Sequence, residues 1–262
     1  MIYEAFDAVA AAYDGREAGN PIMQLMRARS LDILETTFPK GANILDVGCG
    51  TGTEALWLAE RGRKVFAVDS SPLMLDAMSR QAAASGVQIS SRLLRAGDLL
   101  SLVADHGDAS FDGAYSSFGA LNTESDLAPA ITALSRLVRP RGRIVLSVMN
   151  RWCVTEMALM VAKGRLRETF RRARPTLRVA VGSNFVDVTY PSWRQLRRAL
   201  QERFRVVSVQ ALPLLLVPYA WPAFAVHPRV YTAARRWDAS LSSRWPFTWM
   251  GDHLLVVAER RP

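Results

Sequence analysis

Cysteine, histidine and lysine are scarce in this chain, and long apolar runs are missing. Its 262 residues include 2 cysteines and 3 histidines, too few for a disulfide framework or for a zinc site built on cysteine alone. No stretch of 18 uncharged apolar residues occurs, so the sequence predicts no transmembrane helix. The opening segment 1–14 carries acids and tyrosines where a secretory signal would carry a basic and then an apolar region. We therefore expect a protein of the reducing cytoplasm.

The composition is that of a globular protein with a substantial core. Half of the residues are apolar and 22% are charged, which excludes disorder as a description of the whole chain. At this length we expect one large α/β domain, or one domain with a substantial insertion.

Positive charge is concentrated in the second part of the chain. Residues 1–150 hold 14 Lys and Arg against 17 Asp and Glu, whereas residues 151–262 hold 19 against 7. A basic half indicates an anionic partner, such as nucleic acid, a membrane surface or an acidic substrate. A general abundance of arginine would produce the same excess without any partner, and the composition leaves both explanations open.

Strand and helix patterns alternate through the first 150 residues. Buried strands are expected at 44–47, 64–68, 89–95, 111–115 and 143–148, and helices at 4–14, 21–37, 53–61, 71–85 and 127–137. We expect Thr51 or Thr53 to open the third of these helices and Ser71 to precede the fourth. This alternation predicts βαβ units with a parallel sheet between helices.

The rhythm changes after residue 150. We expect a helix at 152–172, a hairpin of 176–181 and 185–190, a helix at 192–202 with Ser192 as its N-cap, and strands at 204–212 and 253–258.

The strongest chemical signal is a glycine-rich turn after the first predicted strand. Residues 44–52 read ILDVGCGTG, and Asp69 ends the next strand, 21 residues after Gly48. Glycine lets the backbone turn tightly and lets a ligand approach, and the second carboxylate can accept ribose hydroxyls. The spacing is G-x-G-x-G rather than the dinucleotide G-x-G-x-x-G, and Asp46 would repel a pyrophosphate but attract an ammonium or sulfonium group. The turn therefore favours S-adenosylmethionine over NAD.

The chain resembles the class I S-adenosylmethionine-dependent methyltransferases. The matching segments are LDVGCGTG at 45–52, VFAVDSSPLML at 65–75, RAGDLL at 95–100, FDGAYSSFGALN at 111–122 and LVRPRGRIVLSV at 137–148. The resemblance implies a Rossmann-like, doubly wound, mostly parallel seven-stranded sheet with helices on both faces, plus a substrate-lid insertion.

The resemblance also implies a set of cofactor-binding residues. Gly48 and Gly50 would approach the methionine and ribose parts of S-adenosylmethionine, and Asp46 would orient its amino group. Asp69 would bind the ribose hydroxyls.

Further positions complete the implied cofactor site. Those near the adenine would be Ser70, Met74, Gly97, Asp98 and Leu99, with Asp98 accepting from the adenine amino group. Ser116 and Ser117 would lie near the transferred methyl, and Tyr13 of a lid helix would reach the cofactor carboxylate. Cys49 is expected to be a packing residue.

The implied organisation has three parts. Residues 1–150 would form the cofactor-binding core with N-terminal lid helices, 151–203 a lid insertion and a core helix, and 204–262 the last two strands. An insertion rich in aromatic residues and proline interrupts these strands at 213–250. It would cap an apolar pocket, contact the inner membrane face, or add a layer to the core.

The sequence indicates the class of methyl acceptor by exclusion. Amino-methylating nucleic-acid enzymes resemble one another in an Asn/Asp-Pro-Pro-Tyr/Phe motif, where this chain reads Tyr115-Ser116-Ser117-Phe118. That region also lacks the cysteine needed for C5 methylation of pyrimidines. We expect transfer to oxygen or nitrogen of a small, apolar or lipid-like acceptor, such as a secondary metabolite, a quinone or a lipid. The alternatives are RNA or protein methylation through the basic C-terminal half, and a cofactor-binding fold without turnover.

A general base is not determined by the sequence. The candidates are His227, His253 and Glu156, and some acceptors need no base. No metal site is predicted. The arginines between Arg165 and Arg178 would bind a phosphate-bearing substrate or an anionic lipid, or form a solvated face.

Overall fold

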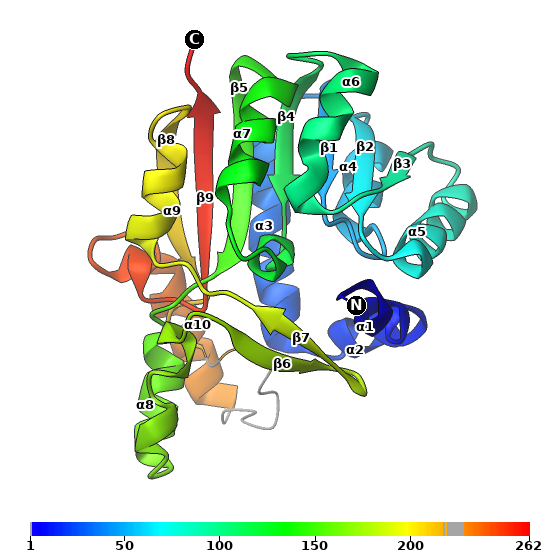
Figure 1. Ribbon diagram of the computed structural model, residues 1–262. Coiled ribbons are helices and arrows are strands. Elements are labelled where there is room, and N and C mark those ends of the chain that lie inside the picture. The colour runs from blue at the N-terminus through cyan, green and yellow to red at the C-terminus, as the bar shows by residue number, and fades with distance from the viewer. Residues whose placement is uncertain (1, 217, 219–227) are drawn as a thin grey trace.

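A mixed seven-stranded sheet forms the centre of the molecule (Figure 1). The computed structural model describes residues 2–216, 218 and 228–262. The strand order is β3-β2-β1-β4-β5-β9-β8, in which β9 runs antiparallel to both β5 and β8 and the other neighbouring strands pair in parallel. The strands are β1 (Asn43–Val47), β2 (Lys64–Asp69), β3 (Ser90–Leu93), β4 (Phe111–Ser116), β5 (Val138–Met149), β8 (Phe204–Leu212) and β9 (His253–Arg260). This confirms the predicted Rossmann-like sheet.

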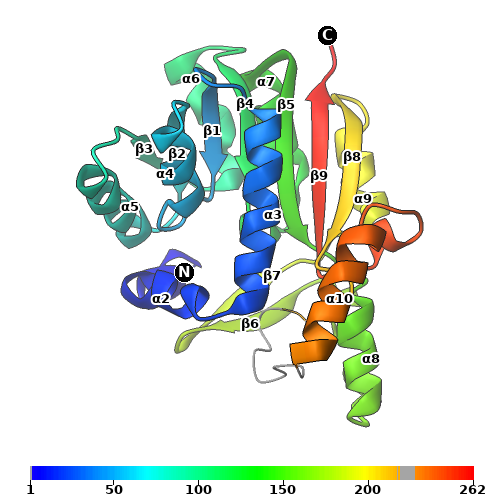
Figure 2. The same cartoon turned by 180° about the vertical axis from the view of Figure 1, so that it is seen from behind.

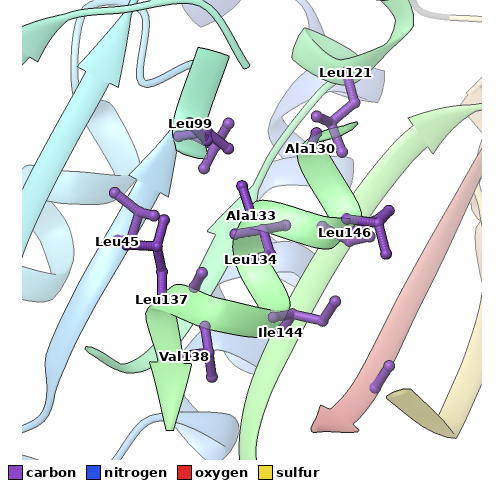
Figure 3. Packing of buried hydrophobic residues seen from close by; sticks show 14 of the residues in the cluster. Leu45, Leu99, Leu121, Ala130, Ala133, Leu134, Leu137, Val138, Ile144 and Leu146 are labelled. Atoms are coloured by element: carbon purple, nitrogen blue, oxygen red, sulfur yellow. The ribbon is translucent and has the colours of Figure 1, made fainter. Parts of the chain in front are cut away.

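Helices cover both faces of the sheet, because alternate strand residues point to opposite sides. Leu45 and Val47 pack into one core with α7 (Ala128–Leu137) and α9 (Trp193–Leu200), part of which is drawn in Figure 3. Ile44 packs into the other core. The helices of that second face are α3 (Pro21–Thr37), seen across the sheet in Figure 2, α4 (Thr53–Glu60) and α5 (Pro72–Ala84).

Helix starts follow the predicted caps at two places and differ at a third. The Ser71 hydroxyl accepts from the Met74 N–H at 3.1 Å, and Ser192 forms a capping box with Gln195. The predicted Thr51 or Thr53 cap of α4 is wrong, because Gly52 is the N-cap and offers no side chain. Thr51 donates its hydroxyl to Asp14 instead.

Three predicted boundaries are also corrected. The helix expected at 4–14 is broken into α1 (Ile2–Asp7), a 3-10 turn and α2 (Tyr13–Ala18). The helix expected at 152–172 is α8 (Val154–Ala162), followed by short 3-10 turns. Strand β5 begins at Val138 rather than at 143. Phe111 pairs with Val138 and Gly113 pairs with Arg143, so the residues between Val138 and Arg143 form an irregularity in the β4–β5 pairing.

The predicted hairpin is confirmed as β6 (Leu177–Val181) and β7 (Asn184–Val188). It crosses below the sheet toward α1 and α2 (Figure 1). Ala5 of α1 packs against Val186 and Val188, so the N-terminal helices and the hairpin cover the same end of the sheet.

The segment 213–250 contains α10 (Pro228–Leu241) and is tied to the core. The buried Asp238 accepts from the Leu214 and Leu215 N–H groups at 2.6 and 2.7 Å and pairs with Arg29 of α3. Across the described ranges, no helix combines the length and the apolar character needed to cross a bilayer.

Candidate active site

A cavity of about 730 Å³ lies at the carboxyl ends of β1, β2, β4 and β5. Strand order reverses between β1 and β4, and open α/β sheets bind their ligands outside such a switch point. The turns after the strands form one wall, whereas the N-terminal helices and the β6–β7 hairpin form the opposite one. The volume lies within the range of small-molecule and cofactor pockets.

The glycine turn supplies the floor of the cavity. Gly48 has φ +75°, and a Cβ there would lie 2.2 Å from the Cβ of Ala120, so packing and backbone conformation both require glycine. Gly50 has φ +54°, and nothing lies within 4 Å of its Cβ position. A ligand can therefore approach the backbone at Gly50.

Asp69 is aimed into the cavity by backbone donors. Its Oδ2 accepts from the Gly50 N–H at 2.8 Å, and its Oδ1 accepts from the Ser71 N–H at 2.9 Å. Burial raises the pKa of this carboxyl, and the two N–H groups offset part of that rise. Each carboxylate oxygen keeps a further lone pair for a ligand hydroxyl.

Asp46 lies below the same turn and is 1% exposed. Its Oδ2 accepts from the Tyr115 hydroxyl at 2.7 Å, whereas Oδ1 has no hydrogen-bond donor among the described residues. Burial raises the pKa of Asp46 well above its usual value, with the Tyr115 hydrogen bond opposing and nearby Glu54 and Asp69 adding to the rise. A cationic ligand would relieve this buried negative charge.

Glu54 and Arg27 form an opposite-charge pair on the cavity wall that the sequence did not single out. The Arg27 Nε lies 3.4 Å from Oε1 of Glu54, and the guanidinium lies 5.5 Å from the ring centroid of Phe118. Burial raises the pKa of Glu54. A carboxylate and a guanidinium side by side suit the two charges of an amino acid group. Only the tertiary fold brings α3 to this wall, so no local pattern pointed to Arg27.

Two aspartates of the N-terminal segment hold it next to the glycine turn and the start of α5 by accepting hydrogen bonds. Asp7 accepts from the Ser71 hydroxyl and the Leu73 N–H. Asp14 accepts from the Thr51 hydroxyl and from the Gln81 side chain. The predicted lid residue Tyr13 lies between them in sequence and lines the cavity.

Of the predicted cofactor residues, seven line the cavity and four do not. Those in the lining are Tyr13, Asp46, Gly48, Gly50, Asp69, Ser70 and Met74. Those outside it are Gly97, Asp98, Leu99 and Ser116.

The four positions outside the lining have specific surroundings. A Cβ at Gly97 would lie 2.9 Å from Glu124, and Asp98 is exposed. The Leu99 side chain is fully buried in the core. Ser116 donates to the Val47 carbonyl at 2.8 Å and joins β4 to β1, whereas its neighbour Ser117 lines the cavity.

The far half of the cavity is largely apolar. Its lining comes mainly from the hairpin, from α1 and its following turn, and from the end of β5. The apolar lining residues there are Phe6, Val9, Met23, Met149, Leu177, Val179, Val181, Val186 and Val188, with Tyr190 beside them. Such a surface favours an apolar ligand over a strongly hydrated one.

Buried ion pairs close this far half. Arg172 donates to Oε2 of Glu156 at 2.7 Å and to Oδ1 of Asp252 at 2.6 Å, and its guanidinium lies 4.9 Å from the Tyr190 ring centroid. Arg171 donates to Oε1 of Glu156 at 2.8 Å. Burial alone would raise the pKa values of Glu156 and Asp252, but the arginines outweigh it and hold both below their usual ranges. The two carboxylates are therefore ionised and neutralised.

The three candidate bases have different positions. Glu156 lines the cavity, but its two ion pairs make it a weak proton acceptor. His253 is fully buried on β9, 3.3 Å from Asp252 and in an edge-on contact with Phe118, and does not line the cavity. The structure thus places this candidate in the core rather than in the cavity lining. His227 lies outside the described residues.

Comparison with known proteins identifies a methyltransferase domain within the chain. The model of the methyltransferase domain family matches residues 44–142. Residues 44–142 thus carry a methyltransferase domain, and the chain is similar to S-adenosylmethionine-dependent methyltransferases. The methyl donor typical of this family is S-adenosyl-L-methionine.

The chain is also similar to a curated O-methyltransferase. The ubiquinone biosynthesis O-methyltransferase of Xylella fastidiosa (strain 9a5c) is 33% identical over 132 residues, which are 50% of this chain and 52% of the relative. The chain spans about half the length of that relative.

Solved structures share the fold across nearly the whole chain. A chain in the complex of the Haloferax volcanii Trm112 methyltransferase activator has a TM-score of 0.64 at 17% identity, covering 100% of this chain and 98% of that one. Geranyl diphosphate C-methyltransferase from Streptomyces coelicolor A3(2) has a TM-score of 0.58 at 16% identity, covering 90% and 81%. At these identities the likeness extends to the fold alone.

Proposed function

We propose that this protein transfers a methyl group from S-adenosylmethionine to oxygen or nitrogen of a small, apolar or lipid-like acceptor. One observation carries the proposal: a single cavity joins the acidic glycine-turn half to the apolar half under the β6–β7 hairpin. An acceptor held under the hairpin would therefore face a cofactor held on the turn.

The residues of the turn fit S-adenosylmethionine. Asp69 would accept the ribose hydroxyls, and Gly50 leaves room for close approach. The unpaired Oδ1 of Asp46 would accept from the ammonium group, and Arg27 would pair with the carboxylate. When bound, the cofactor supplies an activated methyl group on a sulfonium.

The main contribution of the protein to the reaction would be to position the acceptor next to the cofactor. The apolar wall would exclude water and orient the acceptor, which is the largest contribution an enzyme makes when the leaving group is already activated. Glu156 and Asp252 are ionised beside Arg171 and Arg172, so they would orient a polar group of the acceptor rather than remove its proton.

The names of similar proteins support a lipid-like acceptor. The curated relatives are named for ubiquinone biosynthesis, and one protein of the same fold is named for geranyl diphosphate. The apolar half of the present cavity suits the prenylated phenol or quinone that those names suggest.

A methyl-transfer assay tests the proposal. The protein would be incubated with methyl-labelled S-adenosylmethionine and separate pools of prenylated phenols, polyketide phenols, amines, RNA and protein. Labelling of an apolar phenol, hydroxyl compound or amine, lost in Asp69→Ala, is the expected result. Labelling of RNA or protein alone would contradict the proposed acceptor class. Tight cofactor binding with no turnover in any pool would favour the non-enzymatic alternative.

We also propose that segment 213–250 contacts a membrane surface peripherally. Trp237 and Trp245 in its described part are 63% and 74% exposed, and tryptophan prefers the bilayer interface. The double variant Trp237→Ser, Trp245→Ser should reduce sedimentation with lipid vesicles, whereas Trp152→Ser outside the segment should not. Equal sedimentation of all three proteins would contradict membrane contact through this segment.

A further inference from the structure

An open groove lined by arginines lies on the outer surface of α9. Its volume is about 600 Å³, and its lining includes Arg151, Arg194, Arg197, Arg198 and Gln201. None of its lining residues is shared with the cofactor and acceptor cavity. The groove is therefore a separate site.

The helix presents these arginines because of their spacing. Positions 194, 197, 198 and 201 follow the three and four residue repeat of one helix face. The opposite face carries Leu196 and Leu200, both fully buried in the core that α9 shares with α7. Burial of that face fixes α9 in place and directs the arginines outward, at the outer edge of the sheet (Figure 1).

The guanidinium groups lack acidic partners in this part of the structure. Elsewhere many surface arginines are paired, as in Arg136–Asp108 and Arg139–Asp112. Among the described residues, no carboxylate lies within ion-pair distance of Arg151, Arg194, Arg197 or Arg198, and the groove lining contains no acid. The nearest acid in sequence, Glu202, pairs with Arg203 instead.

Arg151 closes the groove from outside the helix. Its Nε donates to the Tyr190 carbonyl at 3.1 Å, which holds the side chain beside the start of α9. Guanidinium groups on neighbouring helix positions repel one another, and an anion between them removes that repulsion. The planar fork of guanidinium matches the oxygens of phosphate better than any other side chain does.

We propose that this groove binds a phosphate-bearing ligand, presented either as a soluble diphosphate or as the headgroups of an anionic lipid. Its site is distinct from the methyl-transfer cavity, so binding does not depend on the acceptor assignment. It also locates part of the positive charge of residues 151–262 in one place.

The test compares two triple variants of equal charge. Arg194→Gln, Arg197→Gln, Arg198→Gln removes the groove charges, and glutamine preserves helix propensity while Leu196 and Leu200 stay in place. The control is Arg80→Gln, Arg139→Gln, Arg141→Gln, which changes exposed arginines outside both the groove and segment 213–250. Binding would be measured by calorimetry with inorganic pyrophosphate and by sedimentation with phosphatidylglycerol vesicles, using phosphatidylcholine vesicles as reference. S-adenosylmethionine affinity and thermal stability would be measured alongside.

The wild type and the control should bind pyrophosphate, phosphatidylglycerol vesicles or both, and the groove variant should lose about tenfold or more in affinity. The cofactor affinity of all three should agree. Pyrophosphate binding alone would identify a soluble ligand, and vesicle binding alone a lipid headgroup. Equal binding by both triple variants, no binding by the wild type, or binding to a short single-stranded RNA and to neither phosphate probe would overturn the proposal.

Discussion

The hydroxyl of Tyr115 donates a 2.7 Å hydrogen bond to Oδ2 of Asp46, its direct neighbour across the β1–β4 pair. The bond leaves Oδ1 as a buried acceptor below the glycine turn. Because Tyr115 is itself buried and its own pKa is raised by burial and by Asp46, it remains a hydrogen-bond donor rather than a charge. The pair thus presents one buried carboxyl group to a cationic ligand.

Asp46→Asn should separate stability from binding. Burial raises the pKa of Asp46, so this carboxyl binds its proton more tightly in the folded protein than in the unfolded chain. The group therefore lowers the free energy of unfolding as pH rises above its pKa in the unfolded chain. The neutral amide carries no buried charge, so the stability of the ligand-free variant should lack this loss with rising pH. Thermal unfolding measures this change, and S-adenosylmethionine affinity should fall about tenfold or more in the same variant.

The wild-type cofactor affinity should also depend on pH. Binding of a cation requires the ionised Asp46, and burial raises the pKa of this carboxyl, so affinity should begin to weaken with falling pH above the range in which an ordinary aspartate titrates. Calorimetry at a series of pH values checks the effect, and Asn at position 46 should flatten the profile. A wild-type profile as flat as that of the variant would contradict a role for Asp46 in binding.

Asp69→Ala should weaken S-adenosylmethionine binding by about 100-fold or more, because it removes a charged acceptor for two hydroxyl groups. Asp98→Ala is the matched comparison. Asp98 is exposed and lies outside the lining, although Arg95 and Ala96 nearby are within it. Its loss should cost about tenfold or less. Equal losses of S-adenosylmethionine affinity in the two variants would show that Asp98 contributes to the site as much as Asp69 does, although it lies outside the cavity lining.

Val179→Phe should narrow the acceptor half without disturbing the cofactor half. Val179 lines the cavity from β6, whereas Phe185 on the same hairpin is 63% exposed and outside it. The phenylalanine should lower kcat/KM for the acceptor by about tenfold or more, with S-adenosylmethionine affinity unchanged. Phe185→Ala should leave both unchanged. Loss of cofactor affinity in Val179→Phe would contradict the assignment of the hairpin to the acceptor half of the cavity.

Glu156→Gln should destabilise the fold by about 3–5 kcal/mol, because it leaves buried Arg172 with one carboxylate fewer. The pKa of Glu156 is held below its usual value, so its stabilisation is present above the unfolded pKa and is lost as pH falls through the folded one. Urea unfolding between about pH 7 and 3 should show a steeper loss of stability in the wild type than in the variant. If Glu156 were a general base, the substitution would instead remove a limb from the pH profile of kcat.

Local patterns predicted the centre of the fold well. The run 44–52 combines a buried strand with closely spaced glycines, and both signals depend on neighbouring residues only. Ser71 and Ser192 were recognisable as caps for the same reason. The positions of Asp46, Gly48, Gly50 and Asp69 at one cavity follow from the parallel order of β1 and β2.

The errors arise from contacts between distant segments. Thr51 could not be recognised as a partner of Asp14, because the two meet only when the N-terminal helices fold over the turn. Arg172 reads as part of an exposed basic run, but Glu156 and Asp252 bury it at the end of the sheet. His253 starts a strand and is polar, yet the packing of Phe118 and Asp252 around it closes it off from the cavity.

The most direct test of the account is calorimetric titration of the protein with S-adenosylmethionine, with Asp46→Asn and Asp69→Ala titrated in parallel. We expect one site per chain with micromolar affinity in the wild type, release of a proton on binding at pH values below the raised pKa of Asp46, and much weaker binding in both variants. Absence of binding to the wild type, or equal affinity in all three proteins, would contradict the assignment of the glycine-turn cavity to the cofactor.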